Sequence, residues 1–221
     1  MKPTKLLNDD GAASMATMIM LSHHAFRRDL GWFAQALAKL DAARIDHLRS
    51  EWSQFCGALH GHHEKEDADI FPHFRAQLPA MAPTLDRLSA QHAAIDPLLT
   101  RGEQAFAKLP EGHEAGAVVR ELQSLLDTHL DEEEAGIIPL LRGAKQFPSP
   151  NNDDEAAMFA SGFAWAMHGI APHVLDKVHA MLPAALRSKL PSAQAEFEAR
   201  CERVWGAYTR TSSETSIPDN A

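Results

Sequence analysis

Two copies of one eleven-residue pattern, at 62–72 and 129–139, hold the residues of this chain best suited to chemistry. His-His-Glu-Lys-Glu-Asp-Ala-Asp-Ile-Phe-Pro aligns without gaps on His-Leu-Asp-Glu-Glu-Glu-Ala-Gly-Ile-Ile-Pro, and five positions are identical. Each copy has a histidine and a glutamate four residues apart, then an apolar pair and a proline. Positions i and i+4 share a helix face, so each copy offers one neutral nitrogen and one anionic oxygen to a single point. The duplication predicts a site for two metal ions.

The elements that must position these residues are helices. Helical periodicity dominates the chain, and no alternating apolar pattern typical of strands appears. The periodicity predicts helices at about 13–39, 43–77, 84–108 and 114–142, with Pro97 kinking the third or breaking it into two. Four long helices joined by short turns predict an all-α fold, an up-down-up-down four-helix bundle.

In such a bundle, a histidine from each helix reaches one level. With turns centred near residues 42, 80 and 111, the candidates lie at matching distances from the turns that join their helices. At about 1.5 Å per residue, the mismatches amount to a few ångströms. His23 is preferred to His24 because it shares a face with Ile19, Phe26 and Leu30. The predicted metal ligands are His23, His62, Glu66, His92, His129 and Glu133.

This donor set indicates which metals the site would take. Imidazole suits iron, copper, nickel or zinc and carboxylate favours harder ions, so the mixture favours iron, manganese or zinc. Each glutamate could bridge two metals while the histidines cap them, leaving a position open for water or a diatomic ligand. Without metal, two carboxylates facing each other in a core would repel and lose hydration. Further ligands stay open: His63, Asp96, His168 and His173.

The chain continues beyond the predicted bundle. The expected organisation is a bundle domain (13–145), a linker (146–154), a C-terminal helical extension that packs on the bundle (155–210) and a disordered tail (211–221). Within the extension, we expect a helical stretch at about 155–181 and a last helix at about 194–208. This extension is where a protein partner could bind.

Composition narrows the class of protein. Thirty acids against 21 bases, without a Lys/Arg cluster, argue against nucleic-acid binding. Cys56 and Cys201 make no disulfide framework and are expected to be buried thiols in a reduced, cytoplasmic setting. Acids interrupt the N-terminal region, so no signal peptide is expected. No apolar run reaches about 18 residues, so we expect no membrane span.

Together these motifs resemble the hemerythrin-like, HHE cation-binding family over about residues 13–145. The resemblance rests on both His-x-x-x-Glu motifs with their Ile-Phe-Pro and Ile-Ile-Pro continuations, and on single histidines in the first and third helices. It implies a four-helix bundle with two iron ions, often oxo- or hydroxo-bridged, that binds oxygen or nitric oxide or reacts with peroxide. It also implies roles: terminal ligands His23, His62, His92 and His129, and bridging ligands Glu66 and Glu133.

One position departs from the family pattern. Oxygen-carrying hemerythrins have a second histidine four residues after the first on helix three, where this chain has Asp96. The difference argues against simple reversible oxygen carriage. Three functions remain: a di-iron module that binds a small ligand in sensing or stress response, a peroxidase- or catalase-like di-iron enzyme, and a metal-stabilised bundle that binds a protein partner.

Overall fold

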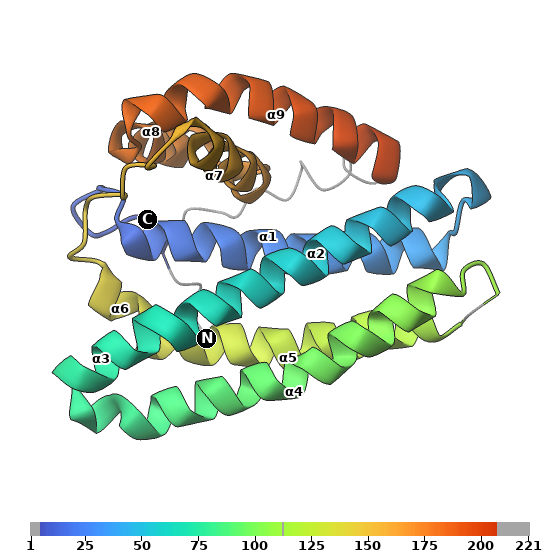
Figure 1. Ribbon diagram of the computed structural model, residues 1–221, viewed down its shortest axis with the longest axis horizontal. Coiled ribbons are helices and arrows are strands. Elements are labelled where there is room, and N and C mark those ends of the chain that lie inside the picture. The colour runs from blue at the N-terminus through green and yellow to red at the C-terminus, as the bar shows by residue number, and fades with distance from the viewer. Residues whose placement is uncertain (1–4, 112, 207–221) are drawn as a thin grey trace. The chain divides into compact units, whose positions relative to one another are not determined.

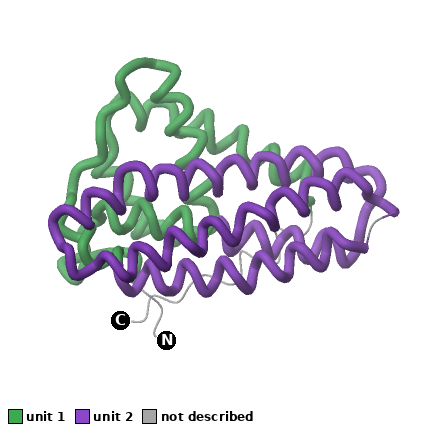
Figure 2. Tube along the Cα trace, turned by 60° about the horizontal axis from the view of Figure 1, so that its bottom comes forward, with its two compact units in different colours: residues 1–25, 137–221 green, residues 26–136 purple. Residues whose placement is uncertain are grey.

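The structure, a computed structural model, describes residues 5–111 and 113–206 (Figure 1). All regular elements in these residues are helical, which confirms the predicted all-α class. The chain divides into two compact units, residues 26–136 and residues 1–25 with 137–221 (Figure 2). We call them the bundle unit and the terminal unit and describe each by itself. The predicted disordered tail (211–221) and residues 207–210 of the predicted extension lie outside the described residues.

The bundle unit consists of four long helices and the short elements between them (Figure 1). The long helices are α1 (Met15–Ala38, of which Phe26 onward belongs to this unit), α2 (Ile45–Lys65), α4 (Ala82–Ala107) and α5 (Glu114–Gly136). The short elements are η1 (Ala42–Arg44), η2 (Glu66–Ile70), α3 (Phe71–Gln77) and η3 (Pro79–Met81). α4 packs on both α2 and α5, as the predicted up-down-up-down bundle requires.

Aromatic side chains fill the interior of the bundle unit. The Trp52 and Phe106 rings stack with centroids 4.5 Å apart, and Phe33 meets Trp52 edge-on at 5.2 Å. These contacts tie α1, α2 and α4 together and contribute area burial plus specific ring geometry. Gly102 makes the stacking possible, because a Cβ there would lie 2.2 Å from a Trp52 ring carbon.

Pro97 lies inside α4 and does not break it. The proline removes one backbone hydrogen bond. Buried residues nevertheless continue at helical spacing on both sides of it, from Leu88 and Ile95 to Leu99 and Phe106. Packing of this continuous apolar face outweighs the single lost bond, since tertiary burial supplies most helical stability.

The backbone of both repeated segments is irregular just after the glutamate. In the first copy, η2 is a π-helical turn in which the Phe71 N–H donates to the Glu66 carbonyl. Pro72 has no N–H and its ring clashes with the carbonyl four residues earlier, so the α-helical pattern cannot continue unchanged. In the second copy, α5 ends at Gly136 and α6 (Ile138–Leu141) begins anew with Pro139 in its first turn. The predicted single helix 114–142 is therefore two.

The terminal unit contains the start of α1, α6 and three further helices, α7 (Asp153–Met167), α8 (Pro172–Met181) and α9 (Ala184–Val204). The Met15 N–H donates to the Ala144 carbonyl at 2.7 Å, and the Arg142 guanidinium donates to the carbonyls of Lys5 and Leu7. These bonds connect its N-terminal segment with the segment that begins at residue 137. α7 packs on α9.

Two expectations for the C-terminal helices are wrong in detail. The predicted stretch 155–181 is divided into α7 and α8, because Gly169 adopts φ +83° and Pro172 begins a new helix. The last helix begins at Ala184 rather than 194 and contains Pro191, because Leu186, Leu190 and Phe197 bury one face across it. In the described residues, no helix has the length and apolar character needed to cross a membrane. The predicted domain limits at 145 and 155 stay a prediction.

Candidate metal centre

The first group of candidate ligands comes from the two repeated segments. His62 lies on α2, Glu66 opens η2, and Glu133 lies on α5. Each offers one ligand atom, and these atoms lie within 4.8 Å of one another. The two glutamate side chains are fully buried. Buried carboxylates require compensating positive charge, because their desolvation is otherwise costly.

A second group consists of three imidazoles: His63 of α2, His92 of α4 and His129 of α5. All three are buried, and their ligand nitrogens also lie within 4.8 Å of one another. The rings of His63 and His92 stack with centroids 4.0 Å apart, and His92 meets His129 at 4.7 Å. Three helices thus bring imidazoles to one place in the bundle unit.

Glu66 spans the two groups with its two oxygens. Its Oε1 lies 3.0 Å from His62 Nε2, and its Oε2 lies 3.4 Å from His92 Nε2. Two ligands that share a metal ion at about 2.0–2.1 Å are separated by roughly 2.9 Å in octahedral and 3.4 Å in tetrahedral geometry. The observed separations fall in this range. Glu133 lies between the same groups, with Oε2 3.9 Å from His129 Nε2.

A chain of polar contacts orients His129. Arg87 donates to the Glu132 carboxylate at 2.8 Å, and this carboxylate accepts from the Gln91 amide nitrogen at 2.9 Å. With its NH₂ group so placed, Gln91 turns its oxygen to His129 Nδ1, 2.9 Å away. His129 therefore carries its proton on Nδ1 and directs the Nε2 lone pair inward. The Arg87 bond lowers the pKa of Glu132, which keeps this carboxyl an acceptor.

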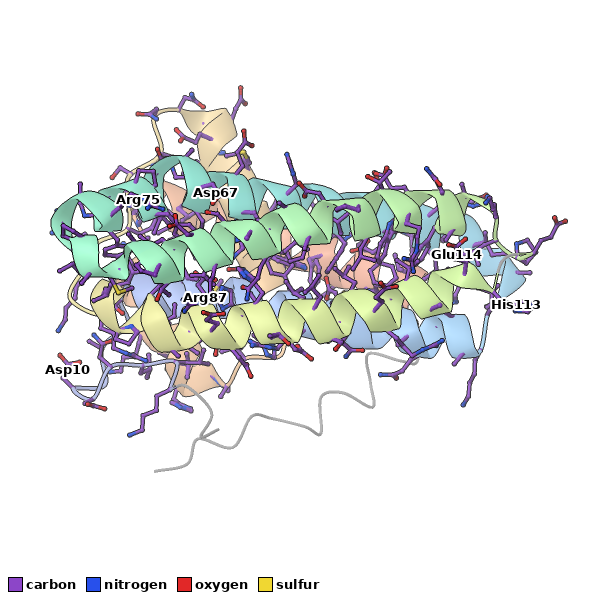
Figure 3. The ribbon with its side chains drawn as sticks, turned by 90° about the horizontal axis from the view of Figure 1, so that it is seen from below. Asp10, Asp67, Arg75, Arg87, His113 and Glu114 are labelled. Carbon is purple, nitrogen blue, oxygen red and sulfur yellow. The ribbon has the colours of Figure 1, made fainter. Side chains whose placement is uncertain are left out.

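Asp67 orients His92 in the same way. Its Oδ2 accepts from His92 Nδ1 at 2.8 Å, and its Oδ1 accepts from the Ser89 hydroxyl at 2.6 Å. Asp67 and Arg87 lie in the same half of the bundle unit, whereas Glu114 marks its opposite end (Figure 3). A carboxylate behind a histidine is the usual support of a metal-binding imidazole, because it fixes the tautomer and raises the basicity of the other nitrogen.

These two supports create a place for a cation. His92 Nε2 and His129 Nε2 face each other at 3.3 Å, although both rings hold a proton on the opposite nitrogen. Two lone pairs at this distance repel unless a proton or a metal ion lies between them. Burial opposes a proton on His92, but hydrogen bonds to Glu66 and Asp67 outweigh it and raise the pKa of His92. The donor set therefore fits a metal ion that displaces this proton.

Comparison with known protein families decides what this arrangement belongs to. The family model described as the hemerythrin HHE cation binding domain matches residues 14–141, more than half of the chain. The chain belongs to the hemerythrin family. It is a metal-binding helical protein, and it has His/Glu groups that could hold a metal ion. Searches among curated proteins and among solved structures gave no significant match.

The placement of the predicted ligands in this hemerythrin domain differs from residue to residue. His62, Glu66 and Glu133 lie in the first group, and His92 and His129 lie in the second. His23 lies on α1 in the terminal unit and is fully buried, whereas His24 is half-buried. The assignment of His23, in preference to His24, and of the other five residues as metal ligands stays a prediction.

The possible additional ligands lie in different places. His63 belongs to the second group. Asp96 is exposed, and its carboxylate lies 4.0 Å from His60 Nδ1. His168 meets the ring of Phe197 at 5.3 Å within the terminal unit, and His173 is exposed. Neither clustered group in the described residues includes these last three.

Sequence reasoning missed the residues that support the ligands. Asp67 and Gln91 carried no motif of their own, although Gln91 directly precedes His92 and Asp67 directly follows Glu66. The acids beside Glu133 differ in their surroundings. Asp131 is exposed, whereas Glu134 is buried and accepts from Arg27 at 2.6 Å.

Proposed function

We propose that this hemerythrin domain holds two iron ions and uses them to bind or react with a small ligand, such as oxygen, nitric oxide or peroxide. One observation carries the proposal: the Glu66 carboxylate directs one oxygen to His62 of the first group and the other oxygen to His92 of the second group. A carboxylate so placed is suited to bridging two cations. The mixed nitrogen and oxygen donors favour iron among the available metals.

His23 completes the proposed ligand set. α1 is one continuous helix, so its residues keep helical positions relative to one another. Phe26 of this helix faces the ring of His62, with centroids 5.4 Å apart. His23 lies three residues before Phe26 and therefore on the same face, one turn along. The proposed ligands are His23, His62, His92 and His129 as terminal donors and Glu66 and Glu133 as bridges.

The protein around these donors favours a small ligand. The Phe71 ring stacks on His92 at 5.6 Å, and Phe26 lies beside His62. Apolar rings limit the water that reaches the donors and strengthen every charge interaction there. When bound, iron would supply the electrons for redox chemistry. The chain supplies the fixed imidazoles, the two buried carboxylates, and the proton held between His92 Nδ1 and Asp67.

An optical titration tests this function. Iron-loaded protein is reduced without air, and oxygen or nitric oxide is then added while the absorption spectrum is recorded. We expect a saturable spectral change that reverses when the ligand is removed. Glu66→Gln should abolish it, whereas Glu64→Gln, two residues earlier and exposed, should not.

Two results would redirect or end the proposal. Continuous consumption of peroxide over many turnovers, lost in Glu66→Gln, would assign an enzyme in place of a binding protein. Purified protein that takes up no iron under reducing conditions, although it is folded, would contradict the di-iron centre itself.

A further inference from the structure

His63 is a buried histidine outside the proposed ligand set. Its side chain is only 4% exposed, and both ring nitrogens lack a hydrogen-bond partner. An imidazole buried in this way is less favourable than one whose nitrogens are hydrogen-bonded. In its neutral form, this ring has a lone pair available for a metal ion.

The surroundings of His63 place this lone pair beside two other donors. Its ring lies parallel to His92, at an interplanar angle of 12°, and edge-on to His129 with centroids 5.2 Å apart. The ligand atoms of the three residues lie within 4.8 Å of one another. Ligands of one ion need separations of roughly 2.9–3.4 Å, as calculated from bond lengths of about 2.0–2.1 Å. Because a metal ion lies in the plane of each imidazole that binds it, the His63 ring must turn out of its parallel stack with His92 when both bind one ion.

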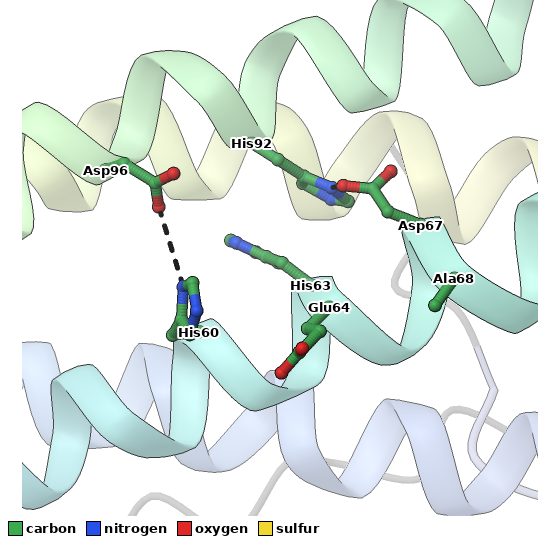
Figure 4. A pocket seen from close by; sticks show the side chains of 7 residues that line it. All are labelled: His60, His63, Glu64, Asp67, Ala68, His92 and Asp96. Atoms are coloured by element: carbon green, nitrogen blue, oxygen red, sulfur yellow. Dashed lines mark hydrogen bonds and ion pairs between the residues drawn. The ribbon is translucent and has the colours of Figure 1, made fainter.

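A pocket connects His63 with solvent. It has a volume of about 400 Å³. Figure 4 shows the His63 ring pointing from α2 toward α4, between the His60–Asp96 pair and the His92–Asp67 pair. The lining residues are His60, His63, Glu64, Asp67, Ala68, His92 and Asp96. Three of them are carboxylates, so the pocket attracts cations.

We propose that His63 is a fifth histidine ligand, and that it binds, with His92 and His129, the metal ion that enters through this pocket. The inference rests on the proposed di-metal function and makes the two metal positions unequal. One position has three imidazoles and faces the pocket. The other position has His62 and the remaining proposed terminal donor, His23. The two glutamates lie between them.

The pattern of side chains around α2 explains how adjacent histidines can both point inward. Successive helical residues differ by about 100° in direction, so His62 and His63 face different neighbours. The ring of His62 lies against Phe26 of α1, and the ring of His63 lies against His92 of α4. A helix that packs on two neighbours in a bundle has an inward face wide enough for both.

The test compares His63→Asn with His47→Asn in the full-length protein. His47 is exposed, lies on the same helix and does not line the pocket, which makes it a matched control. Metal-free protein is titrated with Co²⁺, and both the stoichiometry and the visible d–d absorption bands are recorded. We expect two Co²⁺ per wild-type chain. His63→Asn should weaken one of the two positions by about 100-fold and change its bands, and His47→Asn should leave both unchanged.

The outcomes separate the inference from the function on which it rests. If wild type and His63→Asn bind two Co²⁺ with equal affinity and identical bands, the inference is wrong and the di-metal centre stands. If wild type binds no Co²⁺, the proposed function fails first.

A second measurement avoids mutation. In Zn²⁺-loaded wild type, a ¹⁵N–¹H spectrum of the histidine rings should show one His63 nitrogen shifted by coordination. Two uncoordinated His63 nitrogens would overturn the inference even if His63→Asn does not fold.

The route through the pocket has its own readout. Neutralising Glu64 and Asp96 together, as Glu64→Gln with Asp96→Asn, should slow Co²⁺ uptake severalfold at low salt and much less at high salt, because screening removes the attraction. The d–d bands at saturation should not change. Uptake at the wild-type rate in low salt would contradict entry through this pocket.

Discussion

The support of His92 by Asp67 gives the sharpest test of how this site is built. Asp67 and Asp69 lie in the same π-helical turn, η2. Asp67 holds His92 Nδ1 at 2.8 Å and the Ser89 hydroxyl at 2.6 Å, whereas Asp69 is exposed and pairs with Lys65. Replacing each by asparagine keeps its size and removes its charge. The two variants therefore differ mainly in whether the lost carboxylate faces a proposed metal ligand.

The expected loss of metal affinity follows from the hydrogen bonds that an asparagine amide can form in place of the Asp67 carboxylate. In Asp67→Asn, the amide oxygen still accepts from His92 and the NH₂ group donates to the Ser89 hydroxyl, so the tautomer is kept. The charge-assisted bond becomes a neutral one, and such bonds differ by about twofold in strength. Loss of a supporting carboxylate typically lowers metal affinity by about 10- to 100-fold. We expect Asp67→Asn to fall in that range and Asp69→Asn to change affinity less than about twofold.

The assay is competition between the protein and a chelator of known affinity for Co²⁺, with circular dichroism to show that the helices are intact. Ser89→Ala serves as an intermediate case, because it removes one partner of Asp67 and leaves the carboxylate. Equal affinities of Asp67→Asn and wild type, or equal losses in Asp67→Asn and Asp69→Asn, would refute the role given to this residue.

Three further predictions concern packing, thiol reactivity and capping. In urea unfolding, Gly102→Ala should lower the free energy of unfolding by about 1–3 kcal/mol, because its Cβ would meet Trp52. Gly57→Ala, at an exposed position of α2, should raise it by up to about 1 kcal/mol. A Gly102→Ala variant that is more stable than wild type would contradict the packing. Burial, with a smaller contribution from Glu103, raises the pKa of Cys56 to about 12, so almost no thiolate exists at pH 8. Iodoacetamide should therefore leave Cys56 of the native protein unmodified by mass spectrometry while it labels unfolded protein, and rapid native labelling would be the contrary result. The Asn152 side chain accepts from the Glu155 N–H at 2.8 Å at the start of α7, so Asn152→Ala should cost about 1 kcal/mol, and Asn151→Ala, whose side chain caps nothing, should cost little; equal losses in thermal unfolding would argue against the cap.

The main features of the bundle could be predicted because they follow from spacing. Apolar residues at helical intervals fix the long helices, and the His-x-x-x-Glu repeats place their members on one face. The matching heights of the histidines needed only the rise per residue and the positions of the turns. The structure brings His62, Glu66 and Glu133 into one group and His92 and His129 into the other, and their role as metal ligands stays a prediction.

The features that were missed depend on neighbours that no period encodes. Whether Pro97 breaks a helix depends on the packing on both of its sides, which local rules do not see. The inward direction of His63 depends on where α4 lies relative to α2. Asp67 acts through its contact with His92, and Gln91 acts through its contact with His129 on another helix. Their residue types alone therefore gave no signal. The proline in each repeat was a usable signal for an irregular backbone after the glutamate.

The central claim, that two metal ions share Glu66 and Glu133 in this bundle, is tested most directly by anomalous diffraction at the iron edge from crystals of iron-loaded protein. The account predicts two peaks per chain, one beside His62 and one beside His92 and His129, with a carboxylate oxygen of each glutamate near both. A single peak, or two peaks away from these glutamates, would contradict it.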